Sequence, residues 1–291
     1  SINNKGVEAI LNVIPVQSRD FTWDVTASFS ILRSEVVSIA DGIDQIYVGG
    51  YVGRGNIAIP GLPYGILEGE LIRRDYGSLD GTDHTQVHWD DRTGYTPIVN
   101  ANGGYQFLGY GVIGNPQPDF VYGVTNTLSY KWATLRVQFD SQVGGDVFST
   151  TNSTLLGRGI LQETDFDRFV PVVTNGLSAD GTPNTTQTTA NAHYWPNTGV
   201  FYDENSIYDA SVMRLREVSL SFVAPKSFLN GTPFGNASLT LSAQNIWHYA
   251  WNTPSGTNFD PEVISYGAGS NARGFDEMTG PTAKKYGATL S

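Results

Sequence analysis

The feature of this sequence that most limits its fold is a strict alternation of apolar and polar residues along two neighbouring segments. The first segment is Met213–Leu229 and the second is Asn236–Trp247. A period of two is typical of β-strands that have one apolar and one polar face. The polar positions hold mostly small hydroxyl and amide side chains, a pattern that favours a water-filled lumen on one side and lipid on the other. The predicted apolar face carries Val218, Leu220, Phe222, Leu239 and Leu241.

The composition is compatible with such a sheet. Only 15% of the 291 residues are charged, whereas an average soluble domain has about 25%. Aromatic residues make up 12% and glycine occurs 33 times. The sequence contains no run of about 18 apolar residues, so it predicts no membrane-spanning helix. These values fit an outer-membrane β-barrel, and they equally fit a secreted β-sandwich with long loops.

The charge balance and the lack of cysteine exclude several classes of function. The net charge of −11 argues against nucleic-acid binding, which needs a basic face. A chain without cysteine has neither a disulfide scaffold nor a thiolate metal site. The first residues do not have the basic and apolar regions of a secretory signal. Because Lys5 already lies at the start of a predicted strand, we expect the chain to begin within a longer polypeptide.

Six further segments show alternation or a strand-forming composition, so that about eight strands are predicted in total. They are Gly6–Ile14, Phe21–Leu32, Tyr64–Arg73, Phe120–Tyr130, Leu135–Phe139 and Lys284–Leu290. Aromatic residues gather near the ends of the predicted strands, as they do in the girdles of outer-membrane barrels. These residues are Trp23, Tyr130, Trp132, Trp247 and Tyr249.

The predicted connections differ strongly in length. The short ones are Pro15–Asp20, Tyr130–Ala133 and Pro225–Gly235, whereas Asp75–Pro118 and Gly144–Ala210 are long and mostly irregular. Structureless loops of that length count against a compact soluble domain. Short turns at one end of the strands and long loops at the other are typical of outer-membrane barrels, in which the long loops are extracellular.

No arrangement of residues in the sequence predicts catalysis, a cofactor or a metal ion. A G-x-S-x-G elbow and a glycine-rich phosphate loop are both absent. The acidic pairs that begin at Asp80 and Asp90 do not have the ligand spacing of a calcium loop. His84 and His88 would share one face of a helix, but their neighbours favour an extended chain that separates them by about 13 Å. We therefore expect a protein that is not an enzyme and that holds neither a cofactor nor a metal.

Aromatic residues in the long loops are the candidate contacts for a substrate or a partner protein, because exposed rings stack on sugars and anchor protein interfaces. The alternative is that these rings pack the loops onto one another. The candidates are Tyr105, Phe107, Tyr110, Tyr194, Trp195, Phe201, Tyr202 and Trp251.

Six sequence blocks, in the same order, resemble the C-terminal barrel region of the SusC/RagA family of TonB-dependent outer-membrane transporters. Each block alone is a weak signal, but together they cover most of the chain. The blocks are NKGVE with its hairpin in Asn4–Ile39, GLPYG in Gly61–Asp75, IGNPQPDFVYG in Ile113–Phe148, RLRE in Tyr208–Leu229, NFDPEV in Asn258–Val263 and the closing Pro281–Leu290.

The resemblance implies an all-β fold, an antiparallel transmembrane β-barrel with long extracellular loops. Residues 1–291 would form its C-terminal part, the whole barrel having about 22 strands as in the family. It also implies TonB-dependent import of a glycan, an oligosaccharide or a peptide across the cell outer membrane, together with a SusD-like surface lipoprotein. The plug domain and the TonB box lie N-terminal to this region in the family, and nothing in this sequence resembles them.

Two alternatives from other classes are compatible with the alternating pattern. One is a secreted β-sandwich that binds carbohydrate or hydrolyses glycosides. The other is a self-contained barrel of about eight strands that acts as a pore or a structural protein. The apolar face separates them, because Leu220 and Leu241 would contact a second sheet in a sandwich and lipid in a barrel.

Overall fold

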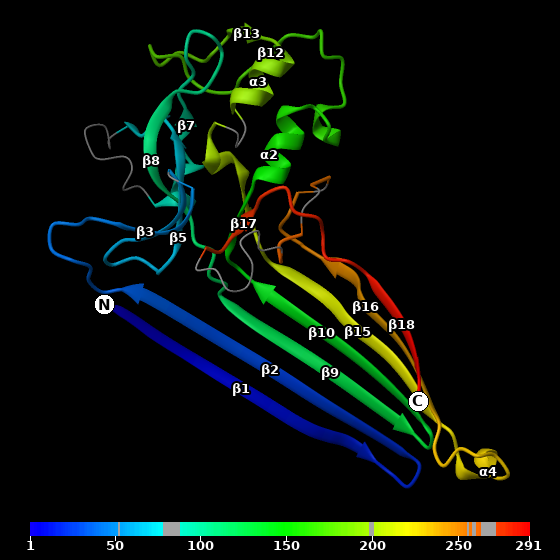
Figure 1. Cartoon of the computed structure of the whole chain (residues 1–291). Helices are drawn as coiled ribbons and strands as arrows, with labels where there is room; N and C mark the ends of the chain where they lie inside the picture. Colours follow the sequence, from blue (N-terminus) through cyan, green and yellow to red (C-terminus); the bar gives the residue numbers. More distant parts are fainter. Residues whose placement is uncertain (52, 78–87, 198–200, 255, 258–259, 263–271) are drawn as a thin grey trace.

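In the part of the chain that the structure describes, seven antiparallel strands form one open sheet (Figure 1). The computed structural model describes residues 1–51, 53–77, 88–197, 201–254, 256–257, 260–262 and 272–291. Neighbouring strands of the sheet are joined by antiparallel ladders. Across the sheet, the order is β1 (Ile2–Gln17), β2 (Phe21–Val36), β9 (Phe120–Tyr130), β10 (Ala133–Val143), β15 (Val212–Val223), β16 (Ser238–Tyr249) and β18 (Lys285–Leu290).

The register of these strands places the alternating residues in continuous rows across the sheet. One row is apolar and consists of Trp23, Leu128, Leu135, Leu220 and Leu241. The adjacent row is polar and consists of Asp24, Thr127, Arg136, Ser219 and Ser242. Because successive side chains on a strand point to opposite faces, the sheet has one apolar and one polar face, as the sequence predicts.

The apolar face of this sheet is exposed. Leu11 on β1 is 59% exposed, and Leu241 on β16 is 45% exposed. In a β-sandwich such side chains pack against a second sheet and become buried. The sandwich alternative is therefore wrong, and the apolar face has the character of a barrel wall that contacts lipid.

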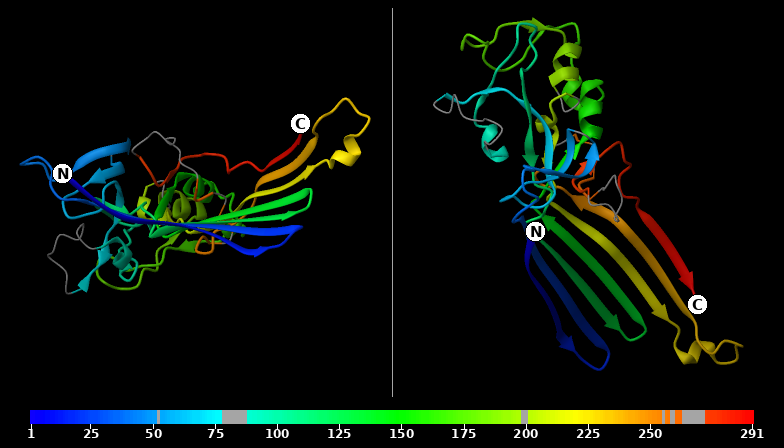
Figure 2. Two further views of the ribbon diagram at one scale, coloured as in Figure 1. Left: turned by 90° about the horizontal axis from the view of Figure 1, so that it is seen from below. Right: turned by 60° about the vertical axis from the view of Figure 1, so that its left-hand side comes forward.

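The connections at the two ends of the sheet differ as the sequence predicts. Residues 18–20, 131–132 and 224–237 join neighbouring strands at one end, which we call the turn end, and the last of them contains α4 (Lys226–Leu229). The longer connections leave the opposite end, the loop end, and build a separate body there (Figures 1 and 2). Lys131 adopts a left-handed φ of 51°, which helps close the two-residue turn between β9 and β10.

The predicted aromatic girdles lie at both ends of the wall. Tyr130 and Trp132 are exposed at the turn end, and Trp23 lies one step further in, opposite Leu128. Trp247 and Tyr249 are exposed at the loop end of β16. In outer-membrane barrels, the short-turn end is periplasmic and the long-loop end is extracellular.

The loop-end body consists of small sheets and short helices. Its four-stranded sheet has the order β3 (Ile46–Tyr51), β4 (Arg54–Ala58), β5 (Ile66–Ile72) and β8 (Phe107–Gly114). Further strands are β14 (Ile207–Asp209), β11 (Asp146–Ser149) and β17 (Phe275–Asp276) in one sheet, β6 (Arg74–Asp75) with β7 (Thr96–Pro97), and β12 (Val172–Val173) with β13 (Gln187–Thr188). The helices are α1 (Trp89–Arg92), α2 (Thr150–Gly157), α3 (Ala190–Asn197) and the 3₁₀ helices η3 (Gln162–Thr164) and η4 (Asp203–Ser206).

The structure adds one strand to this body and corrects the place of another. The described residues of Asp75–Pro118 are mostly irregular, as predicted, but the segment also contains β8, which pairs with β5 over six residue positions. The predicted strand Tyr64–Arg73 exists as β5, but it belongs to the loop-end body and not to the wall. Among the described residues, the wall therefore has seven strands instead of about eight.

The buried apolar core of the protein lies in the loop-end body. Phe148 of β11 and Phe275 of β17 are fully buried, with ring centroids 5.9 Å apart. They form one cluster with Leu67, Leu71 and Ile113 from β5 and β8. No helix in the described part of the chain has the length and apolar character needed to cross a membrane.

Candidate functional site: the polar face and the loop end

A break in the alternation of β15 gives the polar face its charged cluster. Arg216 and Glu217 are consecutive polar residues, and Arg216 has no opposite residue in the ladder with β10 or in the ladder with β16. An extra residue of this kind is a β-bulge, which bends a strand and re-aims its side chains. On the adjacent β16, Asn245 has a left-handed φ of 53° at the same register shift. The bulge allows Arg216 and Glu217 to lie on the polar face together.

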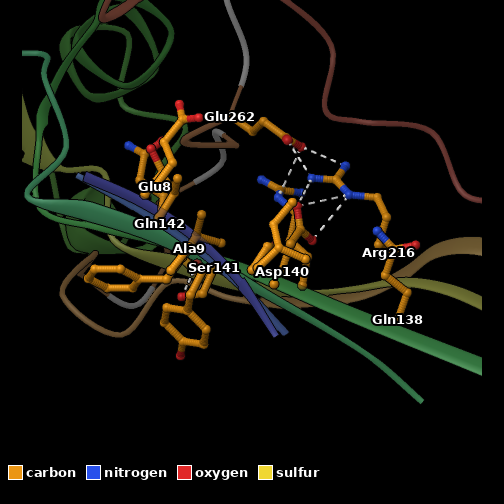
Figure 3. A pocket seen from close by; sticks show the side chains of 17 residues that line it. Glu8, Ala9, Gln138, Asp140, Ser141, Gln142, Arg216 and Glu262 are labelled. Carbon is orange, nitrogen blue, oxygen red and sulfur yellow. Dashed lines mark hydrogen bonds and ion pairs between the residues drawn. The ribbon is translucent and has the colours of Figure 1, made fainter. Parts of the chain in front are cut away.

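Arg216 holds three acceptors from different segments. Its Nε donates to both carboxylate oxygens of Asp140 on β10 at 3.1 Å. Its Nη1 donates to Asn245 Oδ1 at 3.1 Å and to Glu262 Oε2 at 3.0 Å. Figure 3 shows Asp140 and Glu262 converging on this guanidinium. Charge-assisted bonds of this number and geometry are strong and specific, so the guanidinium joins two wall strands to the segment that follows β16.

Arg214 and Asp260 form a buried ion pair beside this cluster. Arg214 is 3% exposed and Asp260 is 2% exposed. Arg214 Nη1 lies 3.1 Å from Asp260 Oδ2, Nη2 contacts Oδ1, and Nε lies 3.1 Å from Glu262 Oε2. Burial by itself raises the pKa of Asp260, but hydrogen bonds from Arg214 and Thr282 outweigh burial and lower the pKa to about 2. Two carboxylates of the β16–β18 connection are thereby fastened to the wall.

A concavity of about 410 Å³ opens on the polar face next to the cluster (Figure 3). Residues from β1, β2, β9, β10 and β15 line it, together with Glu262. The two arginines are already paired with acids, so they position the loop more than they offer free charge. Carboxylate, hydroxyl and amide groups are available to bind a polar solute. Examples in the lining are Glu8, Ser28, Gln138 and Gln142.

Two of the predicted aromatic residues pack against each other. The rings of Tyr105 and Tyr202 meet edge to face with centroids 6.1 Å apart, and Tyr202 donates its hydroxyl to the Tyr105 carbonyl at 2.6 Å. The Tyr105 backbone N–H donates to Asn197 Oδ1 at 2.9 Å. Burial raises the pKa of both tyrosine hydroxyls. These rings link the β2–β9 connection to the β10–β15 connection, as the packing alternative describes.

Phe107 and Tyr110 lie on β8 and not in a loop, contrary to expectation. Their rings meet edge to face at 5.5 Å, and about half of each residue is exposed. The Tyr110 hydroxyl donates to Glu70 Oε1 at 3.4 Å. The strand therefore presents an exposed aromatic pair beside a carboxylate at the loop end.

The other four predicted aromatic residues occupy separate places. Tyr194 contacts Phe166 with ring centroids 6.2 Å apart, and the guanidinium of Arg158 lies 5.1 Å from the centre of the Trp195 ring. Phe201 and Trp251 are partly exposed. The structure thus brings four of the eight residues together, as the pairs Tyr105–Tyr202 and Phe107–Tyr110. The contact of all eight with a substrate or partner stays a prediction.

Two ion pairs of the loop-end body, each with a buried carboxylate, are not predicted from the sequence. Arg54 pairs with Asp203, and Arg74 Nη2 lies 2.9 Å from Glu204 Oε1. Burial raises the pKa of both carboxylates, although their arginine partners oppose this effect. Arg74 and Glu204 are 130 positions apart, so no local spacing in the sequence reveals the pair.

The candidate metal ligands are only partly within the described residues. Asp80 and His84 lie outside them. Asp90 belongs to α1, and its carboxylate lies 3.7 Å from His88 Nδ1. Over the residues that the structure describes, no group of three or more His, Asp or Glu side chains is arranged to hold a metal ion.

The open two-faced sheet, with short turns at one end and a folded body at the other, is a segment of the wall of a large antiparallel outer-membrane-type β-barrel. Solved structures share this fold. The RagAB peptide transporter aligns with a TM-score of 0.63 and 18% identity, over 99% of this chain and 29% of that chain. The RagAB peptide importer in its closed-closed state aligns with a TM-score of 0.62 and 17% identity, over 99% of this chain and 29% of that one.

In sequence, the chain is similar to curated TonB-dependent receptors of Formosa agariphila. It is 26% identical to TonB-dependent receptor P3 over 268 residues, which are 84% of this chain and 24% of the receptor. It is 25% identical to TonB-dependent receptor P26 over 298 residues, 98% of this chain and 28% of the receptor. No family model matches the chain. The chain spans about a quarter of the length of these relatives, and its resemblance to SusC/RagA-type TonB-dependent transporters is confirmed over most of its residues.

Proposed function

We propose that this chain is the C-terminal part of the barrel of a TonB-dependent transporter in the cell outer membrane, which imports a peptide or an oligosaccharide. The observation that carries the proposal is a single sheet with an exposed apolar face, a polar face and its long connections at one end. The curated relatives are TonB-dependent receptors, and the structural neighbour RagAB is a peptide transporter. We propose transport without an enzymatic activity.

The open edges of the sheet support a larger barrel. Among the described strands, β1 and β18 each have a neighbour on one side only. The free N–H and C=O groups of such an edge cannot stay unpaired in hydrocarbon. We infer that further strands of a longer polypeptide pair with these edges, which argues against the self-contained small barrel. The plug domain and its contact with TonB would belong to that polypeptide.

A SusD-like lipoprotein is the partner that we assign to the loop end. On the β10–β15 connection, Phe169 is 97% exposed and the next residue in the chain, Val170, is 53% exposed. Adjacent apolar side chains that stay exposed are typical of interaction surfaces, and Ile160 of the same connection is also exposed. The same end holds the exposed pair of Phe107 and Tyr110, which suits contact with a sugar ring or an apolar peptide side chain.

The orientation of the wall can be tested in the full-length protein in outer membranes. The chain has no cysteine, so Leu220→Cys and Ser221→Cys each add a single attachment site for a spin label within this region. We expect molecular oxygen, which dissolves in lipid, to relax the label at position 220, and a water-soluble nickel chelate to relax the label at position 221. Equal access of both reagents to both positions would sink the barrel-wall proposal.

The partner and the cargo can be tested together by affinity purification of the full-length protein in mild detergent. We expect a surface lipoprotein to co-purify, and native mass spectrometry of the complex to identify bound peptides or oligosaccharides. Phe169→Asp should reduce the amount of lipoprotein, whereas Met278→Asp, another exposed residue at the loop end, should not. If no lipoprotein accompanies an intact barrel, the partner assignment is wrong.

A further inference from the structure

The turn end carries an apolar groove that the transport proposal does not use. The groove has a volume of about 290 Å³ and lies between the β9–β10 turn, the end of β15 and α4. The Trp132 and Phe222 rings are 5.6 Å apart, and Val223 donates its N–H to the Trp132 carbonyl at 2.8 Å. Its floor is therefore part of the wall. The lining includes Trp132, Phe222, Pro225, Phe228, Leu239 and Leu290.

The groove opens on the lipid side of the sheet. Phe222 and Leu239 lie opposite each other in the ladder of β15 and β16, and Leu290 lies opposite Leu239 on β18. Phe222 is two positions from Leu220, so the three side chains continue the apolar face and not the polar face. Phe228 on α4 is 75% exposed and extends the groove beyond the end of the strands.

The turn end is also basic, in contrast to the chain as a whole. Each of the three short connections contains one cation, namely Arg19, Lys131 or Lys226, and the only carboxylate among them is Asp20. The net charge of the whole chain is −11. Basic side chains at the edge of a membrane attract anionic lipid headgroups, and long lysine side chains reach the headgroup level from an apolar surface.

We propose that the turn end binds an anionic phospholipid of the periplasmic leaflet, with an acyl chain in the groove between Trp132 and Phe228 and the phosphate beside Lys131 and Lys226. The site combines the two components that recognise such a lipid, an apolar slot on the lipid side and cations that are chain neighbours of its lining residues Trp132 and Pro225. Lys131 is adjacent to Trp132 in the chain, and Lys226 begins the helix that carries Phe228. The proposal rests on the outer-membrane location proposed above.

The test uses the full-length protein reconstituted into phosphatidylcholine vesicles that contain a trace of photoactivatable lipid. The tracer is phosphatidylglycerol in one preparation and phosphatidylcholine in the other, each with a diazirine in the acyl chain. After illumination, adducts on residues 222–239 are quantified by mass spectrometry. We expect more adducts from phosphatidylglycerol, and Lys226→Glu should reduce them about fivefold or more, because it replaces a cation in the headgroup region with an anion. Phe228→Ser should reduce the adducts from both tracers.

Lys284→Glu makes the same change of charge at the loop end and is the matched control. Equal adduct yields from the two tracers, or equal effects of the two lysine substitutions, would overturn the anionic-lipid site while leaving the transport proposal intact. Adducts at Leu241 without adducts on residues 222–239 would show lipid on the wall but an empty groove, which also overturns the site. If no adducts form anywhere on the apolar face, the outer-membrane location fails, and this site fails with it.

Discussion

Replacing Arg214 with methionine should detach the segment around Asp260 from the wall. The Asp260 side chain is 1% exposed, and without Arg214 it keeps the backbone N–H groups of Glu262 at 3.1 Å and Thr282 at 3.2 Å. Removing one member of a buried ion pair costs about 3–5 kcal/mol, because the other charge stays in the interior without compensation. We expect local opening of the segment, since the wall strands keep their ladders.

Limited proteolysis of the full-length protein in detergent measures this opening, because cleavage follows the equilibrium population of the open segment when opening is fast. A cost of about 3 kcal/mol corresponds to a hundredfold or greater increase in cleavage near Asp260. Arg33→Met is the matched control. Arg33 pairs with Asp119 at 3.1 Å, but more than half of each side chain is exposed, so we expect a cost below about 1 kcal/mol.

The double variant Arg214→Met/Asp260→Leu tests whether the uncompensated Asp260 carboxylate causes the opening of the segment. It removes the uncompensated carboxylate as well as the guanidinium, so it should be cleaved more slowly than Arg214→Met alone. The coupling energy between the two positions should exceed about 1 kcal/mol. Strictly additive single effects, or equal cleavage of Arg214→Met and Arg33→Met, would refute the claim that this buried pair fastens the segment.

Three further predictions concern pH and the lipid face. The folded-state pKa of Asp260 is about 2, below its usual 3.8. Its contribution to the stability of the segment is therefore fully present above about pH 4 and is lost as the pH falls through about 2. Protection of the segment from pepsin should follow the same pH dependence, and Asp260→Asn should remove that dependence. Burial raises the pKa of Asp146 to about 6, although the hydrogen bond from the Asn115 N–H acts to lower it. Thermal stability should therefore rise as the pH falls from about 6 to about 4, and Asp146→Asn should abolish this rise. Trp23 donates its indole N–H to Asn126 Oδ1 at 3.2 Å within the apolar face, so Trp23→Phe should cost about 1–3 kcal/mol in denaturant unfolding, and adding Asn126→Leu should recover most of it.

The wall was predictable because each strand carries its own evidence. The predicted strand Phe120–Tyr130 has the same bounds as β9, and the predicted strand that begins at Phe21 begins there in the structure. Alternation is a local property, because the face on which a strand residue lies can be predicted from its immediate neighbours in the sequence. Lipid on one side and water on the other impose it along most of the strand length.

The loop-end body was not predictable in the same way, because residues far apart in the chain hold it together. Asn56 Nδ2 donates to the Arg273 carbonyl across 217 positions. Strand β8 escaped detection because Gly109, Gly111 and Gly114 interrupt its alternation. Phe107 and Tyr202 were both assigned to long connections, and that assignment does not predict that the Phe107 ring is exposed while the Tyr202 ring is packed.

The charged cluster was partly predictable, because the sequence shows a break in the alternation of polar and apolar residues at this place. Arg214, Leu215 and Arg216 alternate, and Glu217 then repeats the polar character of Arg216. In a strand without a bulge, one of these two charges would face lipid, so a bulge is the solution that keeps both on the wet side. The same bulge brings Arg216 within reach of Glu262 from the next connection. In a barrel strand, a break in the period therefore marks where the wall holds a loop.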